Sequence, residues 1–236
     1  MSKYVPSSNE EKIFLEQYNA KDYPSVAITV DAVVFGVKRD ATENYRKLDK
    51  QTIQVLLVKR EEYPYKGYYA LPGGFVGIEE SLEDTLERTL KNKTNLTGIY
   101  SEQLYTFGAI DRDPRMRIIS SAYISLLDSS KANIKDAIWV PIDEIENYDI
   151  AFDHMQIIEE AKNRLRGKIM ESDIVFHMMP EEFTISELQE VYEIVLGEKL
   201  LAPAFRRVIA KKIEDTGKMT NSAGHRPSRI FRQKVD

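Results

Sequence analysis

The sequence predicts an α+β protein built in two parts, a larger body of strands and helices followed by a small helical domain. Two observations predict this class. Residues 26–37 and 53–59 are dense in β-branched side chains, which is typical of strands. Later in the chain the apolar residues recur at helical spacing, over 153–169 and again over 185–196. A boundary between the two parts is therefore expected near residue 170.

The body is predicted to begin with a short helix over 10–21. In a second helix, over 81–93, three leucines recur every fourth residue and form one buried face. The polar stretch 38–51 is longer than a hairpin needs, so we expect a mobile insertion there. Asp153 is placed to cap the last helix of the body, over 153–169. Strands are expected at 26–37, 53–59, 68–71, 104–107, 118–127 and 137–141.

The C-terminal part carries the signals of a helix-turn-helix with a wing. A capping box at Thr184 opens a helix that Gly197 is placed to end. Pro203 suits the first turn of a second helix, which we expect to run to about Asp215. The basic segment 217–232 then predicts a two-stranded wing. Two helices across a short turn, the second one basic, indicate a DNA-binding element.

Composition limits the class of protein. The chain has 236 residues, of which 42% are hydrophobic and 10% aromatic, enough for a sizeable core. It has no cysteine and three scattered histidines, which exclude disulfides and cysteine-ligated zinc and disfavour a histidine metal site. No window resembles a membrane span or a signal peptide. We expect a cytoplasmic protein with no membrane partner and no cofactor.

Charge is distributed unevenly along the chain. The net charge is −5, yet residues 199–236 contain ten basic and three acidic side chains. A phosphate backbone responds to such local charge, so DNA is the expected partner. The alternatives are a solvated basic tail or a protein-binding module, and interfaces between proteins gain little from this charge. The candidate DNA-binding residues are Thr184, Arg206, Arg207, Lys211, Arg226, Arg229 and Arg232.

The body offers groups suited to a phosphorylated ligand. Backbone N–H groups of a Gly-Gly turn before a helix can face an anion. Arginines can pair with phosphate oxygens, aspartates can accept ribose hydroxyls, and aromatic rings can stack on a base. Self-paired surface charges and core packing are the alternatives. The candidates are Arg60, Tyr63, Gly73, Gly74, Phe75, Glu80, Asp111, Arg112, Asp113, Arg115 and Arg117.

One segment resembles the Nudix box of diphosphate hydrolases, with Gly74, Glu80 and Arg88 at the spacing of the box after a strand ending in LPGG. Three glutamates of the box are replaced. The residues found there are Thr89, Asn92 and Lys93. Such positions converge on one side of a helix, and Mg²⁺ prefers carboxylate ligands, so neither metal binding nor ordinary hydrolysis is expected. The alternative is a hydrolase whose Mg²⁺ has moved to an acidic stripe, Glu80, Glu83, Asp84 and Glu87.

Several strings in order resemble one family, the Nudix-related transcriptional regulators of bacteria: AITVDAVVF, VLLVKR, LPGGFV, EFTISELQEVYEIVLG and GHRPSRIFR. The resemblance implies a Nudix-type α/β/α sandwich with a mixed sheet over residues 1–170, including a linker helix at 153–169. A winged helix would occupy residues 171–236. It further implies a repressor that senses ADP-ribose or a related nucleotide or sugar metabolite and controls NAD metabolism. Palindromic operator DNA, bound by a homodimer, would be its partner.

Overall fold

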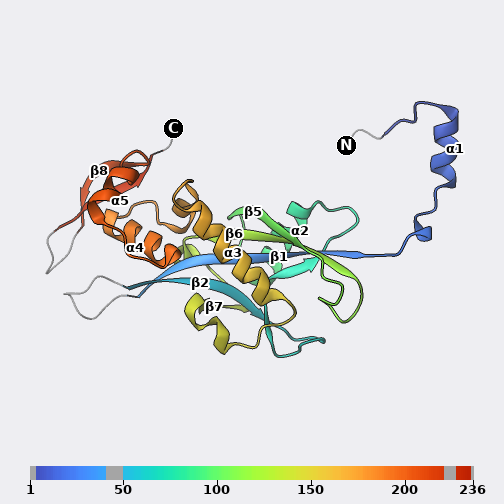
Figure 1. The fold of residues 1–236 in the computed structure, drawn as a ribbon, viewed down its shortest axis with the longest axis horizontal. Coiled ribbons are helices and arrows are strands. Elements are labelled where there is room, and N and C mark those ends of the chain that lie inside the picture. Colours follow the sequence, from blue (N-terminus) through green and yellow to red (C-terminus); the bar gives the residue numbers. More distant parts are fainter. Residues whose placement is uncertain (1–3, 41–49, 221–226, 235–236) are drawn as a thin grey trace.

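The computed structural model describes residues 4–40, 50–220 and 227–234 (Figure 1). Among these residues a seven-stranded sheet follows the order β3-β2-β1-β6-β5, with β4 also pairing with β1 and β7 with β2. Its strands are β1 (Ala27–Asp40), β2 (Lys50–Lys59), β3 (Tyr69–Ala70), β4 (Gly73–Phe75), β5 (Tyr100–Phe107), β6 (Ile118–Leu127) and β7 (Ala137–Pro141). A separate hairpin consists of β8 (Ile213–Met219) and β9 (Arg229–Gln233).

The helices lie around this sheet and at both ends of the molecule (Figure 1). They are α1 (Asn9–Gln17), α2 (Leu82–Thr94), α3 (His154–Lys168), α4 (Ile185–Leu196) and α5 (Ala202–Ile209). Short 3₁₀ turns occupy Ala20–Asp22, Ser129–Lys131, Ile142–Asn147 and Ile174–Met178. This mixture confirms the predicted α+β class.

Strand β1 is the centre of the body because both of its faces are covered. Val33 and Phe35 belong to one hydrophobic cluster with α3, whereas Val30 and Val34 belong to another with α2. Side chains alternate along a strand, so α3 and α2 cover opposite faces of the sheet. The strand is apolar on both sides, which explains the run AITVDAVVF. Because β1 pairs parallel with β6 and antiparallel with β2, the Nudix-type sandwich with a mixed sheet is confirmed.

Two local predictions in the body are wrong. Residues 38–40 and 50–51 are not part of an insertion, because β1 and β2 continue pairing as far as Asp40 and Lys50. Residues 41–49 lie outside the described part of the chain. Gly73 and Gly74 do not form a turn, since they belong to β4 and pair antiparallel with β1. Strand pairing thus uses backbone groups that the sequence had suggested for anion binding.

The C-terminal domain contains the predicted helix-turn-helix and wing. Thr184 and Glu187 form both hydrogen bonds of the capping box at the start of α4. Gly197 ends the helix in the left-handed region at φ 73. Helix α5 is shorter than expected, because Ile213 is already the first residue of β8 and pairs with Gln233.

The two domains share one hydrophobic core. Leu188 and Tyr192 of α4 and Phe205 of α5 are buried in the same cluster as Val33 and Phe35 of β1. Helix α4 packs against both β2 and α3. The backbone N–H of Gln51 in β2 also donates to Glu190 of α4 at 3.3 Å. A movement of α3 or β2 would therefore displace α4, the first helix of the winged domain, directly.

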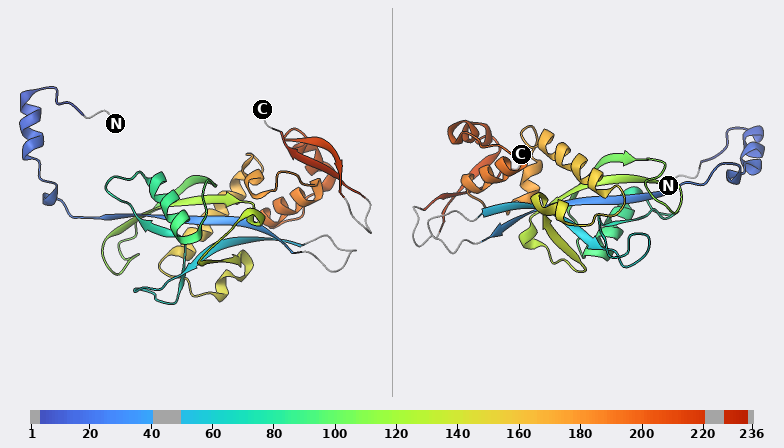
Figure 2. Two further views of the ribbon diagram at one scale, coloured as in Figure 1. Left: turned by 180° about the vertical axis from the view of Figure 1, so that it is seen from behind. Right: turned by 60° about the horizontal axis from the view of Figure 1, so that its bottom comes forward.

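The N-terminal arm stands away from the body at the end opposite the winged helix (Figures 1 and 2). Helix α1 has no buried residue, and the Phe14 side chain is 61% exposed. Ser8 caps the helix by accepting a hydrogen bond from the backbone of Glu11. Within the described residues, no helix is long and apolar enough to cross a membrane.

Candidate effector pocket and DNA-binding surface

A cavity of about 840 Å³ opens where β1, β2 and β4 meet α2 and the start of α3. It brings together most of the ligand-binding candidates of the body. Those that line it are Arg60, Gly73, Gly74, Phe75, Arg112, Asp113 and Arg115. Its lining also includes residues that the sequence did not mark as ligand-binding, among them Thr29, Asp31, Asn92, Lys93 and His154. We call this cavity the effector pocket.

Asp31 of β1 is the polar centre of the effector pocket. Only 6% of this residue is exposed, and its carboxylate accepts a hydrogen bond from Ser120 of β6 at 2.5 Å. Arg112 Nη2 and His154 Nε2 each lie 3.7 Å from an Asp31 oxygen. A side chain at Gly73 would place its Cβ 1.9 Å from Asp31 Oδ1, so this approach requires glycine.

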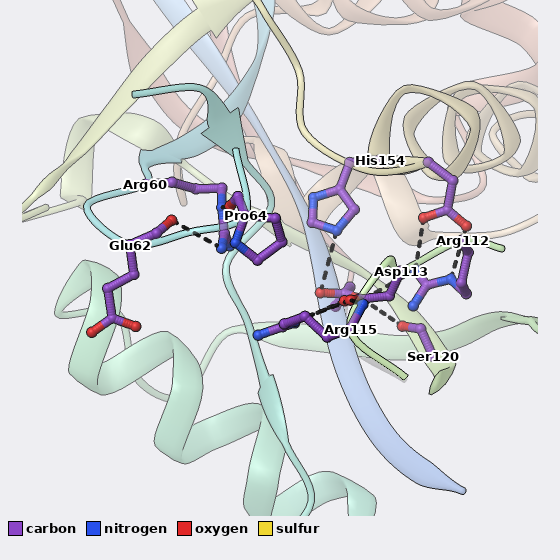
Figure 3. A network of polar contacts seen from close by, with 10 residues as sticks. Arg60, Glu62, Pro64, Arg112, Asp113, Arg115, Ser120 and His154 are labelled. Atoms are coloured by element: carbon purple, nitrogen blue, oxygen red, sulfur yellow. Dashed lines mark hydrogen bonds and ion pairs between the residues drawn. The ribbon is translucent and has the colours of Figure 1, made fainter. Parts of the chain in front are cut away.

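Arg112 is tied to the protein by a buried ion pair (Figure 3). Its Nε and Nη2 donate to the two carboxylate oxygens of Asp153 at 2.9 and 2.7 Å, and only 4% of its side chain is exposed. Asp153 is the N-cap residue of α3, as predicted, but its carboxylate forms no cap hydrogen bond and pairs with Arg112 instead. Arg112 therefore fastens the β5–β6 loop to the start of α3.

His154, the first residue of α3, is completely enclosed in the same network. The backbone N–H of Leu71 donates to its Nδ1 at 3.0 Å. Burial lowers the pKa of His154, although the nearby carboxylates of Asp31 and Asp153 oppose this effect. A lowered pKa favours the neutral ring, which the hydrogen bond from Leu71 also requires.

The mouth of the pocket holds two arginines beside aromatic faces. Arg115 pairs with Asp113 at 3.0 and 2.7 Å, and its guanidinium lies 5.5 Å from the Phe75 ring. Arg60 lies 4.8 Å from the ring of Phe152, and its Nε donates to the carbonyl of Pro64 (Figure 3). Desolvation, and then the charge of Arg115, lower the pKa of Arg60. Crowded cations beside exposed rings suit an anionic, aromatic ligand.

Helix α2 presents the altered Nudix positions to this pocket. Thr89 is buried, and a Cβ at Gly74 would meet its Oγ1 at 2.7 Å. Asn92 and Lys93 line the cavity. Desolvation lowers the pKa of Lys93, partly opposed by the charge of Asp31.

Several candidates of the body are not brought into the pocket. Glu80 does not line it, because its carboxylate accepts hydrogen bonds from Arg88, Thr85 and the backbone of Gly77. Tyr63, Asp111 and Arg117 are absent from its lining as well.

Three residues of the acidic stripe, Glu80, Glu83 and Asp84, are engaged by protein groups. Glu83 accepts from the Tyr123 hydroxyl, and Asp84 completes the capping box with Ser81. In the part of the chain that the structure describes, no three His, Cys, Asp or Glu side chains gather in a way that could hold a metal ion.

A second cavity of about 840 Å³ lies between the body and the wing. His177 stacks on Tyr100 there, with ring centroids 4.0 Å apart. Its arginine, Arg232, is already paired with Glu214 at 2.5 Å. The effector pocket, with several cations at its mouth, is the better match for a phosphorylated ligand.

The DNA-binding candidates gather on the C-terminal domain. Arg206 and Arg207 project from α5 as exposed side chains, and Lys211 follows in the turn after the helix. In the wing, Arg229 pairs with Asp215 at 2.8 Å, as Arg232 does with Glu214. Thr184 is the N-cap of α4, and Arg226 lies outside the described residues. The described candidates all lie on elements of the C-terminal domain, and none of them lines the effector pocket.

Comparison with known proteins assigns each part of the chain. Residues 40–161 match the NUDIX domain, and residues 175–233 match the NrtR DNA-binding winged helix domain. The chain is 34% identical over 232 residues to the "ADPR responsive transcriptional repressor NtrR" of Acinetobacter baylyi, covering 95% of this chain and 88% of that protein.

Two solved structures of Shewanella oneidensis NrtR are also similar. One is complexed with a 27mer DNA; it has a TM-score of 0.74 and 34% identity, and the match covers 88% of this chain and 93% of that chain. The other is its NUDIX domain complexed with ADP ribose, with a TM-score of 0.54 and 34% identity, covering 66% of this chain and 98% of that chain.

Proposed function

The chain belongs to the family of NrtR-type regulators, in which a Nudix domain precedes a winged helix, and from this membership we propose that it is a DNA-binding repressor responsive to ADP-ribose. The observation that carries the proposal is likeness over both domains together, including a repressor that matches 95% of this chain. Control of genes of NAD metabolism stays a prediction.

The chemistry of the effector pocket supports ADP-ribose as the ligand. Arg60 and Arg115 offer guanidinium groups for a diphosphate, and exposed Phe75 offers a face for an adenine ring. Asp113, which holds Arg115 in place, also has carboxylate oxygens that can accept ribose hydroxyls. Ligand-binding roles for these residues rest on their placement in one cavity.

The contacts of α3 offer a physical route from the pocket to DNA. Asp153 and His154 at the start of α3 are held by Arg112 and by the backbone of Leu71. The same helix packs on α4, the first helix of the winged domain. A ligand that binds Arg112 or its neighbours would shift α3, and this shift would change the orientation of α4 and α5.

Hydrolysis is not part of the proposed function. Thr89, Asn92 and Lys93 supply a buried hydroxyl, an amide and an ammonium where a Nudix hydrolase has carboxylates for its cation. We expect no release of AMP when the protein is incubated with ADP-ribose and Mg²⁺ or Mn²⁺. Turnover near 1 s⁻¹ or faster, which is ordinary for an enzyme, would contradict this part of the proposal.

DNA recognition is proposed to require two copies of the chain. One winged helix offers few phosphate contacts, whereas a dimer binds two half-sites and so requires a palindromic operator. In each copy α5 would enter the major groove and the β8–β9 wing would contact the backbone.

The proposal is tested by measuring both binding equilibria on one sample. Fluorescence anisotropy with DNA from upstream of the protein's own gene gives the operator affinity with and without ADP-ribose. Calorimetry gives the ADP-ribose affinity with and without that DNA. Thermodynamic linkage requires the same fold-change in both measurements. Operator affinity that does not respond to saturating ADP-ribose would exclude an ADP-ribose-responsive repressor.

A further inference from the structure

The altered Nudix positions of α2 do not fit the divalent cation that the Nudix family implies. Thr89 faces Gly74 and is 2% exposed, and its hydroxyl has no hydrogen-bond partner among the described residues. Asn92 contributes a neutral amide. Mg²⁺ requires a nearly octahedral set of oxygen ligands and is usually held by at least one carboxylate, which these three positions of α2 do not supply.

Lys93 brings a positive charge to that place. It lines the effector pocket together with Asn92, Gly74 and Asp31. Its ammonium is close enough to Asp31 and Arg60 for their charges to shift its pKa, although desolvation has the largest influence and lowers that pKa. Lys93 therefore adds a positive charge to the lining of the pocket, although the residue is exposed to solvent.

The three arginines of the pocket are already engaged by protein groups. Arg112 donates to Asp153 and Arg115 to Asp113, both in two-pronged pairs. The Nε of Arg60 donates to a backbone carbonyl. Lys93 belongs to no ion pair within 4.0 Å among the described residues. A compact ammonium without a carboxylate partner is well suited to an incoming phosphate.

We propose that Lys93 supplies the positive charge that a divalent cation supplies in metal-dependent Nudix proteins, so that this pocket binds the diphosphate of a nucleotide-sugar ligand without a metal ion. The inference rests on the proposed ADP-ribose response and assigns to Lys93 the neutralisation of the diphosphate. The ammonium of Lys93 would lie against the diphosphate oxygens, with Arg60 and Arg115 at the mouth. Such a sensor responds to the metabolite alone, whatever the free Mg²⁺ concentration.

The test is calorimetric titration of the full chain with ADP-ribose, once in EDTA and once in millimolar Mg²⁺. The wild-type dissociation constant is expected to agree within about twofold between the two buffers. Lys93→Met, which keeps most of the side-chain length and removes the charge, is expected to weaken binding tenfold or more, as loss of a charge-assisted contact to phosphate does. Lys91→Met, on the same helix but outside the effector pocket, is the matched control and should bind as the wild type does.

A charge reversal sharpens the test. Lys93→Glu should bind more weakly than Lys93→Met in EDTA and recover affinity when Mg²⁺ is added, a response absent from the wild type. Equal melting temperatures of all variants show that folding is unchanged. The proposal would be overturned if EDTA weakened ADP-ribose binding to the wild type tenfold. It would also be overturned if Lys93→Met bound ADP-ribose as tightly as the wild type does.

Inorganic diphosphate separates this inference from the proposed function. It is titrated in EDTA into the wild type and Lys93→Met. Binding that depends on Lys93 supports the metal-free anion site even if ADP-ribose itself does not bind, which would refute the ADP-ribose response alone. If the wild type binds neither ADP-ribose nor diphosphate in EDTA, the metal-free site is refuted.

Discussion

Arg112 of the effector pocket and the arginines of the winged helix are held in opposite ways. In the pocket, the Arg112 side chain is 4% exposed and is paired with Asp153, which lies 41 residues further along the chain. On the winged helix, Arg206 and Arg207 are exposed, and the wing arginines pair with carboxylates on the neighbouring strand. The Arg112–Asp153 pair joins elements that are distant in the sequence, whereas the arginines of the winged helix lie on the surface of elements that are close in the sequence.

The two arrangements predict different effects on stability when a charge is removed. Removing one partner of a buried ion pair leaves the other charge desolvated, which destabilises the folded protein strongly. Removing an exposed arginine has little effect on stability, so its effect is seen only when DNA is present. The buried charges of the pocket should therefore affect folding and ligand binding together, and the winged-helix charges only DNA binding.

The largest effect is expected at Asp31, the centre of the pocket network. Asp31→Ala removes the carboxylate near Arg112 and His154 and the acceptor of Ser120. We expect a loss of about 3–5 kcal/mol in the free energy of unfolding, measured with urea. Asp111→Ala, an exposed acid on the β5–β6 loop, should change it by less than about 0.5 kcal/mol. Similar stability of the two variants would mean that the network adds nothing to the fold.

Next in size are the arginines of α5. Arg206→Ala and Arg207→Ala should each lower operator affinity by about 1–3 kcal/mol if the side chain contacts a base edge, with the melting temperature unchanged. Fluorescence anisotropy on operator and unrelated DNA, at two salt concentrations, distinguishes base contacts from phosphate contacts. Lys12→Ala in the arm serves as the charge-matched control. A double variant with wild-type affinity would show that α5 is not the recognition helix.

A fall in pH should lower the stability through His154 and His177 to different degrees. Burial lowers the pKa of His154 in the folded protein, so the unfolded chain binds protons first as the pH falls. The stability is complete above the unfolded pKa of about 6.5 and falls below it, by at most about 1.4 kcal/mol per pH unit for one proton. His154→Gln should flatten urea-unfolding profiles between pH 5 and 6.5.

His177→Gln tests whether burial is the cause. Desolvation lowers the pKa of His177 as well, but this side chain is exposed at the domain boundary. We therefore expect a smaller change of the pH profile than for His154→Gln. Equal flattening by both substitutions would contradict the role of burial in the pocket.

The smallest effect is expected at Thr184, the N-cap of α4. Thr184→Ala removes the acceptor for the backbone of Glu187 and should cost about 1 kcal/mol in unfolding free energy. Thr184→Ser keeps the hydroxyl and should stay near the wild type. Ser81→Ala at the equivalent cap of α2 should cost a similar amount, since both helices have the complete capping box. A much larger loss at Thr184 would mean that its hydroxyl has a further structural role.

Predictions from the sequence succeeded where the cause is local. The capping box at Thr184, the left-handed Gly197 and the β-branched run of β1 are set by a few neighbouring residues. The predicted end of α5, near Asp215, was wrong because that prediction used local spacing alone. Phe205, Ile209 and Ile213 keep helical spacing, but pairing with β9, which local spacing does not reveal, makes Ile213 a strand residue.

The effector pocket was predicted only in part because its connections are long. Its arginines were recognisable by type as candidate phosphate ligands, whereas Asp31 and His154 had no local signal of a role. Asp31 meets Ser120 across 89 residues, and His154 meets the backbone of Leu71 across 83. Arg112 has the expected location but faces a carboxylate of its own protein. Tertiary structure decides whether an arginine pairs with a carboxylate of its own protein or remains available for the phosphate of a ligand.

The close approach of Asp31 to Gly73 has a consequence for the history of the family. Since a Cβ at position 73 would lie 1.9 Å from the Asp31 carboxylate, position 73 cannot gain a side chain while Asp31 is present. A lineage that acquires a side chain at 73 must first lose the carboxylate at 31, and Arg112 then loses one of its two nearby acids. Across related sequences the residues aligned with positions 31, 73 and 112 should therefore be inherited as a set.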